Sequence, residues 1–113
     1  MQDCIFCKIV SKEIPADIVY ENDAVVVFRD IKPAAPVHLL LIPKKHIPTV
    51  LDLEEDNADI MRDIHLAAVK VAREMGLEKG FRLVCNCNRD AGQLVFHIHY
   101  HMMAGRLLHW PPG

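Results

Sequence analysis

Near its carboxyl end the chain alternates histidine with apolar residues, and this alternation constrains the fold more than any other feature. Residues 97–101 read His-Ile-His-Tyr-His. Successive side chains of a β-strand point to opposite faces, so the spacing predicts a strand that carries its three imidazoles on one face of a sheet. The residues expected to point the other way, into the core, are Phe96, Ile98, Tyr100 and Met102.

The other apolar patterns supply partners for this strand. Helical spacing predicts a short helix over residues 4–10 and a long helix that ends at Gly76. The side chains of a capping box at residues 52–55 are expected to begin the long helix. The β-rich runs predict strands over residues 24–29, 37–42, 81–87 and 95–103. The predicted class is α+β, a mostly antiparallel sheet with one long helix and a short N-terminal helix, in a single domain over residues 1–113.

Composition limits the partners and the location. The chain has 13 Lys plus Arg against 15 Asp plus Glu, and neither sign forms a long block. We therefore expect no nucleic-acid partner and no binding to a membrane surface. No apolar run approaches the length of a membrane span, and the first residues lack the basic and apolar regions of a secretory signal. The expected location is the cytoplasm.

The histidine row has two chemical uses. Three histidines could bind a metal ion, but the first and last lie roughly 13 Å apart along a strand, and zinc needs ligands that converge. The other use is attack on phosphorus by one imidazole nitrogen, while the second ring nitrogen donates to an acceptor that fixes the tautomer. The spacing of residues 97–101 favours the nucleophile.

The same row resembles a known family signature. Residues 97–103 follow the pattern His-φ-His-φ-His-φ-φ, which is similar to that of the histidine-triad superfamily. Further segments resemble its histidine-triad nucleotide-binding protein branch, in order and at its spacing, over essentially the whole chain: Asp30-Ile31, Ala35-Pro36, His38, Ile42-Pro43-Lys44-Lys45-His46, Asn86, Gly92-Gln93 and His109-Trp110-Pro111-Pro112-Gly113. The resemblance implies a homodimer that hydrolyses the P–N bond of purine nucleoside 5′-phosphoramidates, or related acyl nucleotides, through a nucleotidyl-histidine intermediate.

The resemblance also implies a role for each polar residue of the site. His99 is the expected nucleophile, and His101 is expected to contact the phosphate. His38 is expected to complete the histidine network, and His97 to brace the strand. Asp30 is expected to accept hydrogen bonds from the ribose hydroxyls, for which a carboxylate is suited.

The remaining substrate contacts follow from the same resemblance. Asn86, Gly92, Gln93 and the main-chain amides of residues 92–94 are expected at the phosphate. Trp110 is expected on an ordered arm that reaches the leaving group across the dimer. Six apolar residues are expected to line the base pocket, although their pattern alone predicts core: Ile5, Phe6, Ile9, Phe28, Ile31 and Leu40.

Leu94 departs from the family pattern. Many members carry Ser or another polar residue there, in contact with the phosphate or the leaving group. Without that hydroxyl we expect slower turnover, or a preference for better leaving groups, since one donor is typically worth roughly 1–3 kcal/mol.

The cysteines raise the question of a metal. In a reducing compartment a pair spaced Cys-x2-Cys indicates metal or redox chemistry before disulfides. Similarity to family members with such a pair implies a structural zinc held by Cys4, Cys7, His46 and His97. The alternative is that the two thiols are small hydrophobes of the short helix. Cys85 and Cys87 are expected to be packing residues, with a four-sulfur site as their alternative use. No cofactor is expected to be required for catalysis.

Two other functions stay open at this point. Other branches of the superfamily use the same nucleophile to cleave dinucleoside polyphosphates or to transfer nucleotides. The chain could also be a nucleotide-binding regulatory module whose catalysis is incidental, an alternative that Leu94 supports.

Overall fold

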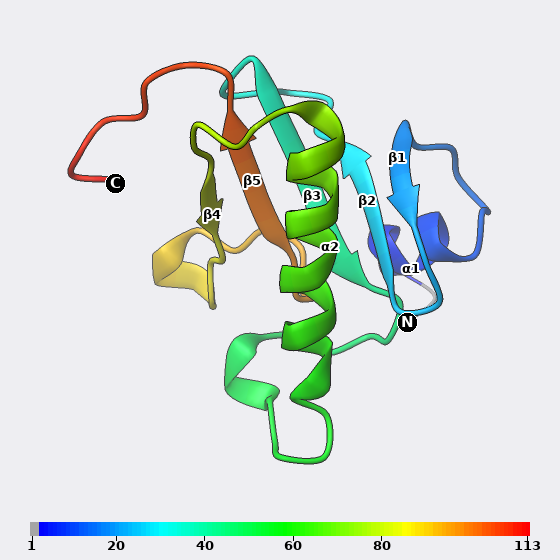
Figure 1. Ribbon diagram of the computed structural model, residues 1–113. Coiled ribbons are helices and arrows are strands. Elements are labelled where there is room, and N and C mark those ends of the chain that lie inside the picture. Colours follow the sequence, from blue (N-terminus) through cyan, green and yellow to red (C-terminus); the bar gives the residue numbers. More distant parts are fainter. Residues whose placement is uncertain (1–2) are drawn as a thin grey trace.

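A five-stranded antiparallel sheet, ordered β1-β2-β3-β5-β4, forms the centre of the computed structural model, which describes residues 3–113 (Figure 1). The elements in chain order are α1 Ile5–Val10, β1 Ile18–Glu21, β2 Val25–Arg29, β3 Val37–Pro43, η1 Val50–Asp52, α2 Asp59–Met75, β4 Arg82–Val84, η2 Arg89–Ala91 and β5 Tyr100–Ala104. The predicted α+β class is confirmed. The patterns did not predict β1, and β4 occupies only part of the strand predicted over residues 81–87. Within residues 3–113 we find no helix with the length and apolar character to cross a membrane.

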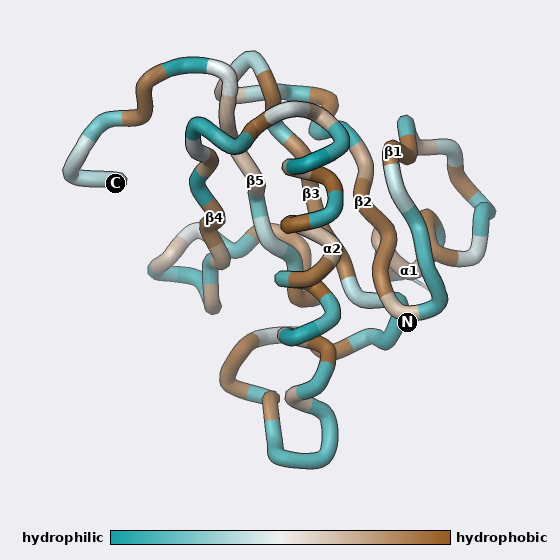
Figure 2. Tube along the Cα trace, viewed as in Figure 1, coloured by the Kyte–Doolittle hydropathy of each residue, from teal (hydrophilic) through white to brown (hydrophobic). Residues whose placement is uncertain are grey.

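Helix α2 covers one face of the sheet (Figure 1). It packs against Val25 and Val27 of β2 and against Leu39 and Leu41 of β3. In Figure 2 hydrophobic and hydrophilic segments alternate along α2, as expected for a helix with one buried side. The helix ends as predicted at Gly76, whose left-handed φ of 71° suits glycine. Its buried residues are Ile60, Ile64, Ala67, Ala68, Val71 and Ala72.

The predicted start of this helix is wrong. The Thr49 side chain accepts a hydrogen bond from the Leu51 N–H. The Thr49 N–H in turn donates to an Asp52 carboxylate oxygen at 3.1 Å. Asp52 is therefore the third residue of the short turn η1 and does not cap a long helix. Helix α2 begins at Asp59, after Ala58, without a side-chain cap.

Helix α1 packs against the opposite face, so both faces of the sheet are covered. Because side chains alternate along a strand, neighbours such as Val25 and Val26 are both fully buried but belong to different layers. The core cluster on the α1 side consists of Phe6, Ile9, Val26, Phe28, Leu40 and Ile42.

Only part of the predicted histidine strand forms. Strand β5 begins at Tyr100, and residues 95–99 run outside the sheet. The pairing of β3 with β5 ends at Leu41 and Tyr100, although β3 continues to Pro43, and the Ile98 N–H donates instead to the carbonyl of Ile47 at 2.7 Å. The inward orientation predicted for Phe96 is wrong, because that side chain is 45% exposed. The other predicted core positions of this row are at least half-buried: Ile98, Tyr100 and Met102.

Candidate functional site

The histidines of residues 97–101 gather on the α1 side of the sheet. The ring of Phe6 packs edge-to-face on His97 and His99, with centroids 5.9 and 5.0 Å apart. The rings of His99 and His101 lie 5.2 Å apart. His97 is fully buried, His99 is 7% exposed and His101 is half-buried. The row therefore concentrates imidazoles in a mostly dry layer, although His101 is its one histidine within a strand.

The hydrogen bond of His99 fixes its tautomer. Its Nδ1 lies 2.8 Å from the main-chain carbonyl oxygen of His97. A carbonyl only accepts, so Nδ1 carries the proton and Nε2 keeps its lone pair. Burial lowers the pKa of His99, opposed by this hydrogen bond and by the negative charge of Asp30. His99 is therefore a neutral imidazole at neutral pH, with a nucleophilic nitrogen available.

His38 and His101 form a directed hydrogen-bonded pair. The Ala34 N–H donates to His38 Nδ1 at 2.9 Å, so the proton of His38 lies on Nε2. That Nε2 lies 2.9 Å from His101 Nδ1 and donates to it, which leaves the His101 proton on Nε2. Burial lowers the pKa of His101, as do His99 and His38, against the opposing charge of Asp30. His101 thus presents a neutral N–H donor beside His99.

Asp30 completes this group, which we call the relay: Asp30, His38 and His101. One Asp30 carboxylate oxygen accepts from the Lys32 N–H at 2.8 Å, and the other lies 3.5 Å from His38 Nε2. The three potential ligand atoms lie within 4.8 Å of one another, a composition also found in cation sites. The Ala34 N–H forces the proton onto His38 Nε2, however, so this nitrogen has no lone pair for a metal. Hydrogen bonding explains the arrangement.

The apolar residues predicted for a base pocket divide into two groups. Phe6, Ile9, Phe28 and Leu40 are buried together in the core cluster beneath α1. Ile5 is 48% exposed and Ile31 is 93% exposed, so neither packs in the core as the apolar pattern alone predicts. The buried group also contacts the histidines, because Phe6 packs on His99.

The loop before the histidines is held by Gln93. This buried side chain accepts from the Asn88 N–H at 2.7 Å and donates to the carbonyls of Pro48 and Val95 at 2.8 and 3.0 Å. Gly92 has φ 87°, a left-handed conformation that favours glycine. The Gln93 amide group is therefore occupied with loop contacts.

The main-chain amides of this loop are also partly occupied. Those of Gly92 and Gln93 donate to the carbonyls of Arg89 and Asn88, at 2.9 and 3.1 Å. Within residues 3–113 the Leu94 amide donates no hydrogen bond, and the Leu94 side chain is 90% exposed. Asn86 lies half-buried just beyond β4. One of the three predicted phosphate-binding amides is thus available.

The predicted zinc ligands also come together, in a group that we call the Cys2His2 cluster: Cys4, Cys7, His46 and His97. His97 Nδ1 lies 3.4 Å from Cys4 Sγ and 3.6 Å from Cys7 Sγ, and His46 Nδ1 lies 3.3 Å from Cys7 Sγ. His97 Nε2 donates to the Pro43 carbonyl at 2.8 Å, so the lone pair on Nδ1 faces the sulfurs. All four ligand atoms lie within 4.8 Å of one another.

These distances fit a tetrahedral zinc. Zinc–sulfur and zinc–nitrogen bonds of about 2.3 and 2.0 Å place ligand atoms roughly 3.3–3.8 Å apart. Burial lowers the pKa of His97 to about 4, the Pro43 hydrogen bond opposing and His46 and His99 adding to the shift, and burial also lowers the pKa of His46. Both imidazoles are therefore neutral, as metal ligands must be.

Cys85 and Cys87 stand apart from this cluster. Cys85 packs against the core on the α2 side of the sheet. Burial, together with the neighbouring Cys87, raises the pKa of the Cys85 thiol. Neither residue joins the metal-type groups found within residues 3–113, so the four-sulfur alternative is wrong.

Two positioning groups were missed by sequence reasoning. The Ala34 amide sets the tautomer of His38, and the Pro43 carbonyl sets that of His97. Both act through the main chain, and neither residue type signals such a role. The segments Ala35-Pro36 and Pro43 within the family resemblance were the available hint, since they adjoin these groups.

Comparisons with known proteins match this geometry. A family model described as "Scavenger mRNA decapping enzyme C-term binding" matches residues 3–108. A HIT family hydrolase from Legionella pneumophila is 50% identical, with a TM-score of 0.95 over 98% of this chain and 100% of that one. A 14 kDa zinc-binding protein from Brassica juncea is 48% identical over 98% of this chain and 100% of that protein. A histidine triad nucleotide-binding protein from Candida albicans is 31% identical, with a TM-score of 0.81 over 96% of this chain and 83% of that one.

The sheet, the helix on each face and the histidine row form an α+β fold that is shared with HIT family hydrolases. The chain belongs to the histidine-triad (HIT) superfamily.

Proposed function

We propose that this protein hydrolyses the P–N bond of purine nucleoside 5′-phosphoramidates, or of related acyl nucleotides, with His99 as the nucleophile. One observation carries the proposal: the His97 carbonyl holds the proton of His99 on Nδ1, which leaves Nε2 free beside the N–H donor of His101. An unprotonated nitrogen next to a directed donor is what a displacement at phosphorus requires.

Substrate binding uses the groups around this pair. The base occupies the apolar side near Phe28, with Ile31 at the exposed edge, and the Asp30 carboxylate accepts from the ribose hydroxyls. The α-phosphate then faces His99 Nε2. His101 and the Leu94 amide donate to its oxygens.

The reaction has two displacements. In the first, His99 Nε2 forms a bond to the α-phosphorus and the bond to the leaving nitrogen breaks while that nitrogen takes a proton from solvent; the neutral His101 keeps its Nε2 proton and donates it in a hydrogen bond to the phosphoryl group. In the second, water attacks the same phosphorus, gives a proton back to solvent and releases the nucleoside monophosphate from His99. The His38 N–H supports His101 throughout. No divalent cation is needed at the phosphate.

The first experiment follows release of monophosphate from adenosine 5′-phosphoramidate. We expect turnover by the wild type and a loss of several orders of magnitude in His99→Ala, because the nucleophile is removed. His65→Ala is the matched control, since His65 lies on α2 and contacts Tyr100 on the other side of the sheet. Absence of turnover by the wild type would contradict the proposal.

We also propose that the Cys2His2 cluster binds one structural zinc ion. The fit of the four ligand atoms to a tetrahedron supports this, and one relative is a zinc-binding protein. Bound there, zinc would cross-link α1 to the segments around His46 and His97 and hold them in place. Metal analysis of protein purified without chelator is expected to give one zinc per chain. Folded protein that contains no zinc after this chelator-free purification would contradict the assignment.

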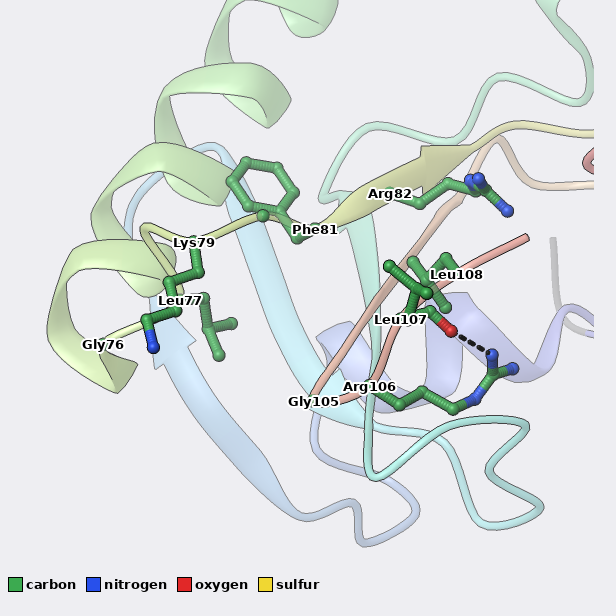
Figure 3. A pocket seen from close by; sticks show the side chains of 10 residues that line it. Gly76, Leu77, Lys79, Phe81, Arg82, Gly105, Arg106, Leu107 and Leu108 are labelled. Carbon is green, nitrogen blue, oxygen red and sulfur yellow. Dashed lines mark hydrogen bonds between the residues drawn. The ribbon is translucent and has the colours of Figure 1, made fainter. Parts of the chain in front are cut away.

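The proposed homodimer would use the face at β4. A pocket of about 600 Å³ lies between the end of α2, β4 and the C-terminal arm (Figure 3). Phe81 and Leu107 line it and are 36% and 82% exposed, and Arg82 and Arg106 extend beside Leu107. Strand β4 is also an edge strand, open to pairing with another chain. A second copy would cover these apolar groups.

The arm itself supports an exchange between subunits. Figure 1 shows it leaving the sheet beside β4, on the side remote from α1. Trp110 on this arm is 82% exposed, so it is free to reach the site of a partner. Light scattering is expected to give a dimer for the wild type and a monomer for Phe81→Glu, with Lys8→Glu on α1 as the charge control. A monomeric wild type would contradict the dimer.

A nucleotide-binding role with incidental catalysis is the second candidate. Leu94 favours it, because an exposed apolar side chain stands where a hydroxyl could assist the leaving group. A His99→Ala protein that binds nucleotide and keeps its cellular effect, but has lost hydrolysis, would favour this candidate over the hydrolase.

A further inference from the structure

His97 is a member of the Cys2His2 cluster and also contacts the proposed nucleophile, His99. The side chain of His97 faces the sulfurs of Cys4 and Cys7 through Nδ1, at 3.4 and 3.6 Å. The main-chain carbonyl of the same residue accepts the Nδ1 proton of His99 at 2.8 Å. The cluster and the catalytic tautomer are thus separated by a single residue.

The main chain that carries the His97 carbonyl is held outside the sheet. Residues 95–99 form no ladder of main-chain hydrogen bonds, but the Ile98 N–H of the same peptide group donates to the carbonyl of Ile47 at 2.7 Å. Ile47 directly follows His46, a member of the cluster. The His97 side chain adds contacts with the Pro43 carbonyl on one ring nitrogen and with the thiols on the other. The orientation of the carbonyl therefore depends on how firmly the cluster holds the His46 segment and the His97 side chain.

We propose that the Cys2His2 cluster is a positioning unit for the nucleophile, acting on His99 through the carbonyl of His97. When the four ligands hold a zinc ion, His97 is fixed and its carbonyl keeps the His99 proton on Nδ1. When the cluster is broken, the carbonyl moves and His99 populates the other tautomer, whose Nε2 carries a proton and cannot attack. The kinetic part of this inference rests on the proposed function.

The kinetic signature follows from where the cluster lies. Within residues 3–113 its four side chains form no hydrogen bond with Asp30, the proposed contact of the ribose, and the ring of Phe6 lies between His97 and Phe28, the proposed contact of the base. Loss of the cluster should therefore lower kcat and leave KM nearly unchanged. A merely structural role would disturb both values together, because the whole α1 side would loosen.

The test compares Cys7→Ser with Cys7→Asp, because a carboxylate still binds zinc whereas a hydroxyl binds it poorly. Cys85→Ala is the control, a thiol on the opposite face of the sheet. For each protein we would measure zinc content, kcat, KM and the imidazole 15N–1H NMR signals of His99.

Cys7→Ser is expected to lose zinc, to lose kcat by roughly 10- to 100-fold and to show mixed His99 tautomers. Cys7→Asp is expected to keep zinc, to recover kcat toward the wild-type value and to keep the proton on Nδ1. A zinc-free Cys7→Ser protein with unchanged kcat and tautomer would overturn the proposal.

A second measurement covers the case in which Cys7→Ser does not fold. Zinc would be removed from the wild type with a chelator, the fold checked by circular dichroism, and zinc then restored. A tautomer change that reverses with zinc supports the proposal, and an unchanged tautomer in folded, zinc-free protein overturns it. If the wild type shows no phosphoramidate turnover, the proposed function fails, but the NMR signals still decide this inference.

Discussion

The two histidine groups of this protein use similar side chains but are positioned in different ways. In the relay, His38 and His101 lie on the neighbouring strands β3 and β5, where the register places Leu40 opposite His101. In the Cys2His2 cluster, His46 and His97 lie outside the strands, and the thiols come from the start of α1. The first group is positioned by the sheet and the second by its own ligands.

This difference indicates which group tolerates change. A strand fixes the main chain before any side chain interacts, so the relay needs its hydrogen bonds only to choose tautomers. The segments of the cluster have no such frame, and side-chain contacts must hold them in place. We therefore expect relay variants to affect catalysis and cluster variants to affect stability as well.

Among changes that leave His99 in place, the largest effect should come from His38→Phe. Removing the donor frees His101 Nδ1 to take the proton, so the group facing the phosphate no longer donates. We expect kcat to fall by about 100-fold, the lower range for loss of one donor to the transition state, with little change in melting temperature. Steady-state kinetics and thermal unfolding measure the two quantities. His38→Gln is the control, because its amide can accept from the Ala34 N–H and still donate to His101. Equal loss in both variants would contradict the relay.

Zinc removal, unlike the His38→Phe change, should lower the stability of the folded protein. Free zinc at 100 times its Kd would stabilise the folded state by about 2.7 kcal/mol, which corresponds to a melting temperature higher by roughly 10 °C. Calorimetry of zinc-loaded and zinc-free protein measures the difference. The His38→Phe variant should show the same zinc-dependent shift as the wild type. A melting temperature independent of zinc would remove the distinction between the two groups.

Leu94→Ser tests the departure of the loop from the family pattern. A new hydroxyl near the phosphate should raise kcat/KM by about tenfold, the value of one hydrogen bond of about 1.4 kcal/mol. The gain should be greatest for strongly basic leaving amines, and Leu94→Ala should not reproduce it. An equal rate in the serine and alanine variants would show that the hydroxyl has no role.

The smallest effect is the dependence of activity on pH. Protonation of His99 Nε2 would remove the proposed nucleophile. The pKa values of His99 and His101 both lie below the ordinary value of 6.5, so kcat/KM should stay level near neutral pH and fall only below about pH 6.5. The groups facing the His101 ring are His99, His38 and Asp30. Below pH 6.5 the unfolded chain binds this proton more readily, so the contribution of His101 to stability is lost as the pH falls through the folded pKa. NMR titration of His101 checks the assignment, and an acid limb above pH 6.5 would contradict it.

Sequence reasoning succeeded where one pattern had one solution. The alternation of residues 97–101, the spacing along α2 and the glycine at position 76 led to the α+β class and to the end of the long helix. It failed where two local solutions competed. Asp52 could cap a long helix or close a short turn, and Thr49 decided in favour of the turn.

The candidate site shows the same division between features that the sequence predicts and features that it does not. The residue types of the relay and the cluster, and their likeness to a family, were visible in the chain, as was the missing hydroxyl at Leu94. The sequence did not show which nitrogen of each histidine carries the proton, because main-chain groups of Ala34, Pro43 and His97 decide it.

The sequence by itself therefore determined the chemical groups of this protein and the face on which they gather, because strand and helix periods depend on local geometry alone. Tertiary structure decided that residues 95–99 leave the sheet, that Phe96 turns outward and that His97 meets the thiols of α1. Those outcomes depend on which distant segment supplies a hydrogen-bond partner, and the local spacing of residues does not specify that partner.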